Sequence, residues 1–211
     1  MIKAILFDMD GVLIDSEPLW KKAIKKVMKG YGFDFSYEMC NETKGMRVDE
    51  VTHYWKKKLS ANFESKTAAN EIIEEVIFLI HKEGKPMVGV LDAIENAKNK
   101  NIKLALASSS SMKIIDTVLS KLNIKSYFDA IHSAEHEEFG KPHPQVFISA
   151  AQSLNTLPEH CLVIEDSLNG VIAAKAAKMK VIAIPEIQEF ELPEFSIADV
   201  ILKSMRELTL D

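Results

Sequence analysis

Short apolar runs alternate with longer amphipathic segments over the second half of the chain, which predicts strands and helices in turn. Four runs have the length of buried strands, at residues 103–107, 130–133, 161–165 and 181–184. A segment with helical periodicity precedes each of them, at residues 92–99, 112–122, 144–154 and 167–177. Because strands that alternate with helices build parallel sheets, we expect an α/β fold, a Rossmann-like doubly wound sheet with helices on both faces.

From Ser16 to about Glu83 the pattern is different: it predicts helices and no convincing strand, and Gly84-Lys85-Pro86 then ends the last helix. Ser16 stands where it can cap a helix that Pro18 opens. Further on, apolar residues at helical spacing predict the buried face of a helical bundle: Ile72, Ile73, Val76, Ile77 and Ile80. We therefore expect a helical cap domain at residues 15–87. It would be inserted into a core of residues 1–14 and 88–211, above the carboxyl ends of the strands.

Composition narrows the class of protein. The 211 residues are 47% hydrophobic and 27% charged, which is ordinary for a globular protein with a sizeable core. The net charge of −5 and the lack of a basic, aromatic-rich stripe predict neither a nucleic-acid nor a membrane partner. Cys40 and Cys161 stand far apart and are expected to be reduced thiols. With neither a signal-peptide pattern nor an apolar run of membrane-spanning length, we expect a cytoplasmic protein, and a monomer.

The paired aspartates Asp8 and Asp10 are the strongest sign of chemistry. They follow an apolar run at residues 4–7, where a buried strand is expected to end. The alternation of a strand would turn both side chains to the same side. Burying two carboxylates together is costly unless a metal or another partner neutralises them. Folding alone does not explain this arrangement, so it indicates a reactive site.

Two further signals lie at predicted strand ends. The run from Ser108 to Ser111 precedes a predicted helix, so its hydroxyls and free backbone N–H groups can bind an anion. Capping of the helix by one serine is an alternative explanation. The two roles are compatible, with Ser108 and Ser109 on the anion. Lys141 stands before Pro142 in a segment that its prolines hold extended, and an ammonium fixed in this way suits a phosphate group.

Acidic residues also end the predicted strand at residues 161–165. Glu165 and Asp166 precede Ser167, and either Asp166 or Ser167 could cap the next helix. Together with the paired aspartates, these acids are oxygen ligands suited to a hard cation. The absence of Cys or His clusters favours magnesium over zinc. A carboxylate nucleophile, a neighbouring acid and base, a cation and anion-binding groups together suit phosphoryl transfer.

In this order, the four motifs resemble those of the haloacid-dehalogenase superfamily, in its β-phosphoglucomutase-like branch. They are Asp8-Met9-Asp10-Gly11, Ser108 at a strand end, Lys141-Pro142 and Glu165-Asp166-Ser167-Leu168-Asn169-Gly170. The resemblance covers essentially the whole chain. It is especially clear for the 2-deoxyglucose-6-phosphate or hexitol phosphate phosphatases, as in Asp15-Ser16-Glu17-Pro18-Leu19-Trp20. It implies a Mg²⁺-dependent phosphatase of small sugar or polyol phosphates that forms an aspartyl-phosphate intermediate.

The resemblance also implies a role for each site residue. Asp8 would be the nucleophile, and Asp10 the general acid and base. Magnesium would be held by Asp8, the backbone carbonyl of Asp10, and Asp166, with Glu165 close by. The residues expected to bind the substrate are Ser108, Ser109, Lys141 and, on the cap, Arg47.

A phosphomutase of the β-phosphoglucomutase type is the main alternative, because it would share every core residue. Trp20 stands where these mutases carry histidine, and the cap offers a single arginine, Arg47, for a second phosphate; both observations favour the phosphatase. Lys44 before Gly45 resembles the mutase cap instead. A non-enzymatic receiver-like domain, switched by phosphorylation of Asp8, would explain the nucleophile and the cation. It would not explain the second aspartate or the cap.

Overall fold

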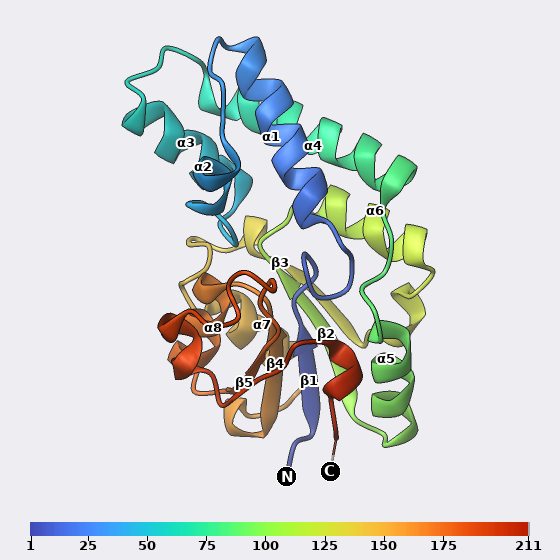
Figure 1. Ribbon diagram of the computed structural model, residues 1–211. Coiled ribbons are helices and arrows are strands. Elements are labelled where there is room, and N and C mark those ends of the chain that lie inside the picture. Colours follow the sequence, from blue (N-terminus) through green and yellow to red (C-terminus); the bar gives the residue numbers. More distant parts are fainter. Residues whose placement is uncertain (211) are drawn as a thin grey trace.

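The computed structural model describes residues 1–210 and contains a six-stranded parallel sheet with helices around it (Figure 1). The strands are β1 (Ala4–Phe7), β2 (Lys103–Ser108), β3 (Ala130–Ser133), β4 (Cys161–Glu165), β5 (Lys180–Ala183) and β6 (Val200–Ile201). Their spatial order is β3-β2-β1-β4-β5-β6, and every neighbouring pair is parallel. The predicted doubly wound α/β fold is confirmed.

Strand β1 lies inside the sheet, and its register determines which residues meet at the carboxyl edge. Phe7, its last residue, pairs with Leu106 of β2 and Ile164 of β4. Because the three strands are parallel and in register, the residues that follow lie side by side at one edge. These residues include Asp8 after β1, Ser108 at the end of β2 and Glu165 at the end of β4.

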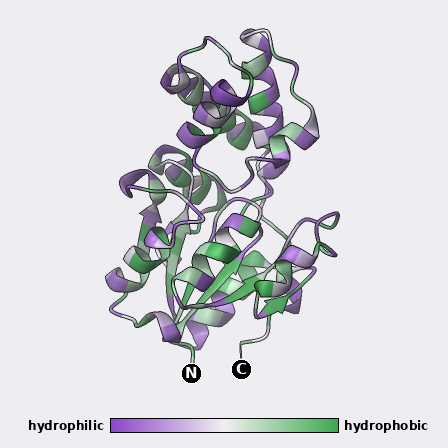
Figure 2. Cartoon of the chain, turned by 90° about the vertical axis from the view of Figure 1, so that its left-hand side faces the viewer, coloured by the Kyte–Doolittle hydropathy of each residue, from purple (hydrophilic) through white to green (hydrophobic). Residues whose placement is uncertain are grey.

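Successive side chains of a strand point in opposite directions, so the buried strands present apolar residues on both faces of the sheet. Helices cover both faces. In β1, Ile5 and Phe7 pack on one face and Ala4 and Leu6 on the other, all fully buried. The hydrophobic residues accordingly gather on the strands and on the inner sides of the helices (Figure 2). The first face is covered by α5 (Val90–Asn99) and α6 (Met112–Leu122), the second by α7 (Gln145–Ser153) and α8 (Leu168–Ala176). Short 3₁₀ helices lie at Lys125–Tyr127, Ala134–His136, Pro158–His160, Pro193–Ile197 and Met205–Glu207.

Between β1 and α5 the chain forms four helices, which we call the cap: α1 (Glu17–Gly30), α2 (Tyr37–Asn41), α3 (Val48–Lys58) and α4 (Ser65–Glu83). Ile72, Val76 and Ile80 of α4 are fully buried, as their helical spacing predicts. In Figure 1 the cap lies above the carboxyl edge of the sheet, at the end of the molecule opposite to both termini. No helix within residues 1–210, α4 included, is long and apolar enough to cross a membrane.

The two segments that join the cap to the rest of the chain run side by side. Ile14 and Pro86 form an antiparallel bridge, and the N–H of Asp15 donates to the carbonyl of Lys85 over 2.9 Å. The cap is therefore attached through a pair of adjacent linkers. Domain boundaries at residues 14/15 and 87/88 stay a prediction, and these linkers lie close to them.

Two local features differ from the predictions. Ser16 occupies the N-cap position of α1, but its hydroxyl makes no capping hydrogen bond because it donates to Asp10 instead. Strand β6 has no counterpart in the predicted elements. It contains only Val200 and Ile201, both partly exposed. An apolar run this short does not indicate a strand in the sequence.

Candidate active site

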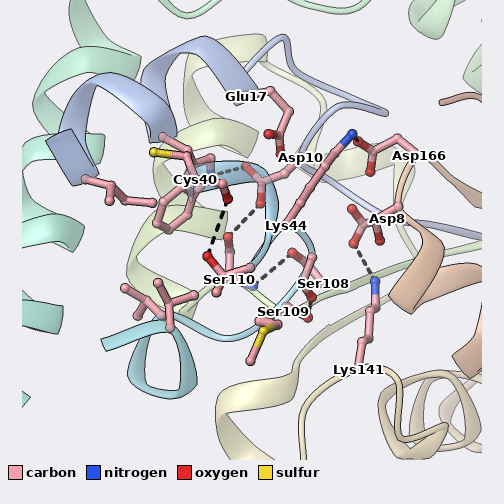
Figure 3. Close-up of a pocket in the computed structure, with 18 of the residues that line it drawn as sticks. Asp8, Asp10, Glu17, Cys40, Lys44, Ser108, Ser109, Ser110, Lys141 and Asp166 are labelled. Atoms are coloured by element: carbon pink, nitrogen blue, oxygen red, sulfur yellow. Dashed lines mark hydrogen bonds and ion pairs between the residues drawn. The ribbon is translucent and has the colours of Figure 1, made fainter. Parts of the chain in front are cut away.

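A pocket of about 650 Å³, part of it open to solvent, lies between the carboxyl edge of the sheet and the cap (Figure 3). The core supplies a charged floor that includes Asp8, Lys141 and Asp166. The cap supplies apolar walls with Trp20, Ile24, Met46, Val48 and Val51, and also the charged residues Glu17, Lys21 and Lys44. The pocket thus has a polar end for an anion and a less polar end beneath the cap.

Lys141 and Asp8 form a buried ion pair on the floor. Lys141 Nζ lies 2.7 Å from Asp8 Oδ1 and 2.6 Å from Glu165 Oε1, and it also donates to the carbonyl of Ala107 over 3.2 Å. Burial alone would lower the pKa of Lys141, but the charges of Asp8 and Glu165 outweigh it and raise that pKa. Burial raises the pKa of Asp8 well above its usual range, although Lys141 opposes the shift.

Glu165 is fully hydrogen-bonded and holds Lys141 in place. Its Oε1 faces Lys141, while its Oε2 accepts from the N–H groups of Asp166 and Ser167 and from the Ser167 hydroxyl, each over 3.0 Å. Gly170 leaves room for this carboxylate, because a Cβ at that position would overlap it. Glu165 therefore positions the floor of the pocket.

Asp10 has a different environment from Asp8. Its Oδ1 accepts hydrogen bonds from the Ser16 hydroxyl (2.6 Å) and from the indole N–H of Trp20 (2.8 Å). Its Oδ2 accepts from the Ser110 hydroxyl (2.6 Å). Whereas Asp8 is paired with an ammonium, Asp10 is held by three neutral donors. The two carboxylates of the motif thus lie in one pocket with separate partners.

The serines at the end of β2 make different contacts. Ser108 Oγ accepts from the N–H of Ser110 over 3.1 Å and can donate its own proton to a ligand. Ser109 Oγ donates to the carbonyl of Gly45 in the cap over 2.9 Å. Ser111 occupies the N-cap position of α6 without a capping hydrogen bond, and Glu135 accepts from the Met112 N–H instead. Helix capping therefore does not account for the run.

Three carboxylates could hold a cation. Asp8, Glu165 and Asp166 each offer an oxygen, and these oxygens lie within 4.8 Å of one another. Asp166 is buried, and Lys44 Nζ forms an ion pair with its Oδ2 at 2.9 Å. Burial raises the pKa of Asp166 to about 7, despite the opposing charge of Lys44. Three buried carboxylates with oxygens this close together are hard ligands, which fit a cation such as magnesium.

Lys44 connects the cap to the core. Besides Asp166, its ammonium contacts Glu189 at 2.9 Å and Glu186 at 3.4 Å. Burial would lower the pKa of Lys44, but Asp166 and the other acids raise it. The backbone carbonyl of Lys44 also accepts from the Asn169 side chain over 3.0 Å. These contacts and the Ser109–Gly45 bond hold the loop between α2 and α3, which we call the cap loop, against the strand ends.

Arg47 does not lie with the other predicted residues. Its Nη1 donates to the carbonyls of Ala134 (3.1 Å) and Glu137 (2.9 Å), and its Nη2 lies 3.3 Å from Glu50. Glu50 in turn accepts from the N–H of Gly140, next to Lys141. Arg47 is not among the residues that line the pocket. Its role in substrate binding stays a prediction, whereas Asp8, Asp10, Ser108, Ser109, Lys141 and Asp166 all line the pocket.

The family model of haloacid dehalogenase-like hydrolases matches residues 5–184 of the chain. The chain belongs to this family. The match runs from β1 through β5, so it contains the four predicted motifs and the whole cap. The predicted superfamily is confirmed.

Individual relatives of this haloacid dehalogenase-like hydrolase are similar over nearly the whole chain. It is 39% identical to hexitol phosphatase B of Escherichia coli (strain K12), over 99% of its own length and 95% of that protein. It is 33% identical to the phosphorylated carbohydrates phosphatase of Thermotoga maritima, over 83% of its own length and 82% of that protein. The crystal structure of β-phosphoglucomutase from Clostridium difficile superposes with a TM-score of 0.87 at 28% identity, covering 100% of this chain and 94% of the mutase.

Some pocket residues of this hydrolase carried no recognisable signal as site residues. Glu17, at the start of the cap helix α1, is half-buried and lines the pocket, and loss of solvent around its carboxyl together with the charge of Asp166 raises its pKa to about 8. Cys40 also lines the pocket, from the short helix α2. Ser110 lies in the predicted serine run, but its partner Asp10 is 100 positions away in sequence. Only the folded chain brings such partners together.

Proposed function

We propose that the protein is a Mg²⁺-dependent phosphatase that hydrolyses small sugar or polyol phosphates through an aspartyl-phosphate intermediate. The observation that carries the proposal is the pair of carboxylates in one pocket, Asp8 held by an ammonium and Asp10 by three neutral donors. A nucleophile benefits from a fixed position beside positive charge, whereas a general acid and base must gain and lose a proton. The two environments support these separate roles.

The reaction is a double displacement at phosphorus. First, an Asp8 oxygen attacks the phosphorus, the bond to the sugar oxygen breaks, and that oxygen takes a proton from the Asp10 carboxyl. Next, the Asp10 carboxylate takes a proton from water, whose oxygen attacks the phosphorus of the aspartyl phosphate. The bond to Asp8 then breaks. Inorganic phosphate leaves, and both carboxyl groups return to their starting states.

Positive charge and hydrogen-bond donors beside Asp8 stabilise the phosphoryl oxygens. Lys141 Nζ lies 2.7 Å from Asp8, and Ser108 can donate its hydroxyl proton. Magnesium, held by Asp8, the backbone carbonyl of Asp10, and Asp166, would add a divalent charge beside the same oxygens. The close approach of the buried Asp8 and Asp166 carboxylates supports this set of ligands.

The substrate class is inferred from the pocket and from the relatives. A pocket that joins an anion-binding floor of Lys141 and Ser108 to walls from the cap suits a phosphate group attached to a small organic molecule. The names of two relatives, a hexitol phosphatase and a phosphorylated carbohydrates phosphatase, support the same class.

A phosphomutase needs a cation in the cap to hold a second phosphate. Lys44 is already paired with three acidic side chains, Lys21 with Glu186, and Arg47 faces core carbonyls. Hydrolysis is therefore the better-supported reaction, even though the mutase shares the fold.

The test is a phosphate-release screen with Mg²⁺ across sugar, polyol and nucleotide monophosphates, with isomerisation of β-glucose 1-phosphate assayed alongside. We expect steady turnover on sugar or polyol phosphates and its loss in a folded Asp8→Asn variant, because the amide cannot form the acyl phosphate. Faster isomerisation than hydrolysis would support the mutase instead. A single phosphorylation without turnover would support the receiver-like switch.

A further inference from the structure

Trp20 connects the cap to the carboxylate of Asp10. It lies in the first turn of α1, and its indole Nε1–H donates to Asp10 Oδ1 over 2.8 Å. The cap loop is held down on the core nearby by Lys44 at Asp166 and by Gly45 at Ser109. A side chain that moves with the cap therefore contacts a reacting group of the core.

The three groups that donate hydrogen bonds to Asp10 differ in whether they can also accept one. The hydroxyls of Ser16 and Ser110 can rotate and become acceptors, whereas an indole N–H can only donate. As long as Trp20 is in place, Oδ1 must therefore remain an acceptor. When Asp10 carries a proton, the proton sits on Oδ2, where the Ser110 hydroxyl can accept from it.

We propose that Trp20 is a positioning residue, whose indole N–H fixes the orientation of the Asp10 carboxyl so that Oδ2 alone exchanges a proton with the leaving oxygen and with water. The inference rests on the proposed function and deepens it, since it assigns the geometry of the proton transfer to a residue of the cap.

Two matched substitutions separate this role from packing. Trp20→Phe keeps an aromatic wall in the pocket but removes the N–H. Trp55→Phe is the control, because Trp55 is buried in the cap against Phe35 and its Nε1 has no hydrogen-bond partner within residues 1–210. Both variants lose an indole, but only Trp20→Phe loses a hydrogen bond to Asp10.

The kinetic test compares two leaving groups in the first step. A sugar alkoxide needs the Asp10 proton, whereas 2,4-dinitrophenolate leaves without one. In rapid mixing, we expect Trp20→Phe to slow phosphorylation by a sugar phosphate at least about tenfold, at nearly unchanged KM, since general acid catalysis contributes about 10²–10⁴. The burst of dinitrophenolate should match wild type, and Trp55→Phe should match it on both substrates.

Equal losses on the two substrates, or no loss on either, would overturn the inference. A wild-type protein that turns over no sugar or polyol phosphate would overturn the proposed function instead.

A second measurement needs no substrate. The indole N–H of Trp20, identified in the NMR spectrum by its loss in Trp20→Phe, should resonate downfield of that of Trp55. Its resonance should move upfield in Asp10→Asn, because an amide oxygen is a weaker acceptor than a carboxylate. An unchanged Trp20 resonance in Asp10→Asn would contradict the contact itself.

Discussion

At the scale of single residues, the carboxylates of Asp8 and Glu165 contact the same ammonium but have different surroundings. Asp8 shares Lys141 with Glu165, and Glu165 is fixed by the backbone at the start of α8. The ammonium thus has one neighbour that would react and one that would not. Glu165 also has room for this position because Gly170, in the first turn of α8, has no side chain.

We expect Gly170→Ala to destabilise the protein by about 1–3 kcal/mol, the range for overpacked sites, because the new methyl group overlaps the Glu165 carboxylate. Turnover should fall with it, since Lys141 loses its second partner. Gly30→Ala is the control, because a Cβ there meets nothing within 4 Å. It should be neutral or stabilising by up to about 1 kcal/mol. Urea denaturation measures both, and similar stabilities for the two variants would contradict the close packing at Gly170.

The core residues of the site could be predicted because each follows an apolar run. Asp8, Ser108 and Asp166 stand next to strand ends, and parallel strands bring such ends to one edge. The contacts of Trp20 and Arg47 could not be predicted in this way. They depend on how the cap sits on the sheet, and that placement is decided by packing between segments far apart in sequence.

At the scale of elements, the loop that leads into α3 is joined to the loops after β3. Arg47 bridges two core carbonyls there, and Glu50 accepts from the N–H of Gly140. The same helix start thus contacts the segment that carries Lys141. This arrangement favours a role for Arg47 in holding the cap closed.

We expect Arg47→Lys to lower kcat/KM by a similar factor on sugar phosphates and on a small aryl phosphate. A lysine keeps the charge, but it lacks the planar fork of donors with which Arg47 binds Ala134 and Glu137. Steady-state kinetics on both substrates provides the test. A loss confined to the sugar phosphate would instead support the predicted contact between Arg47 and substrate.

The strands and helices themselves were largely predictable. Residues 130–133 and 161–165 form strands with the predicted bounds, and residues 112–122 form the predicted helix. Apolar runs and helical periodicity suffice where an element has at least four residues and packs against the core. They fail at β6, which has two partly exposed residues, and at the start of α1, where Ser16 serves Asp10 instead of the helix.

At the scale of the whole molecule, the acidic cluster at the pocket floor would link binding of the proposed metal to stability. Burial raises the pKa of Asp166 from 3.8 to about 7 in the folded protein, so the metal-free fold binds this proton more tightly than the unfolded chain does. The resulting stabilisation is complete below about pH 4 and is lost as the pH rises through 7. Magnesium needs the ionised carboxylate, so its effect has the opposite dependence on pH.

We therefore expect Mg²⁺ to raise the melting temperature more at pH 8 than at pH 6, each relative to protein with EDTA. Because a ligand that binds only the folded state stabilises it, the rise should also grow with Mg²⁺ concentration. Asp166→Asn should abolish most of the Mg²⁺ effect while remaining folded. A rise of the same size in wild type and Asp166→Asn would place the cation elsewhere.

The paired linkers between Asp15 and Lys85 also bear on how such a chain can change over evolution. Since the two crossings are joined by a hydrogen bond, the inserted segment begins and ends at one place, next to the end of β1. The sheet carries the reacting carboxylates, and the insertion contributes the walls around the rest of the substrate. Exchange of one insertion for another at this point is thus a modular route to new substrates with the reaction itself preserved.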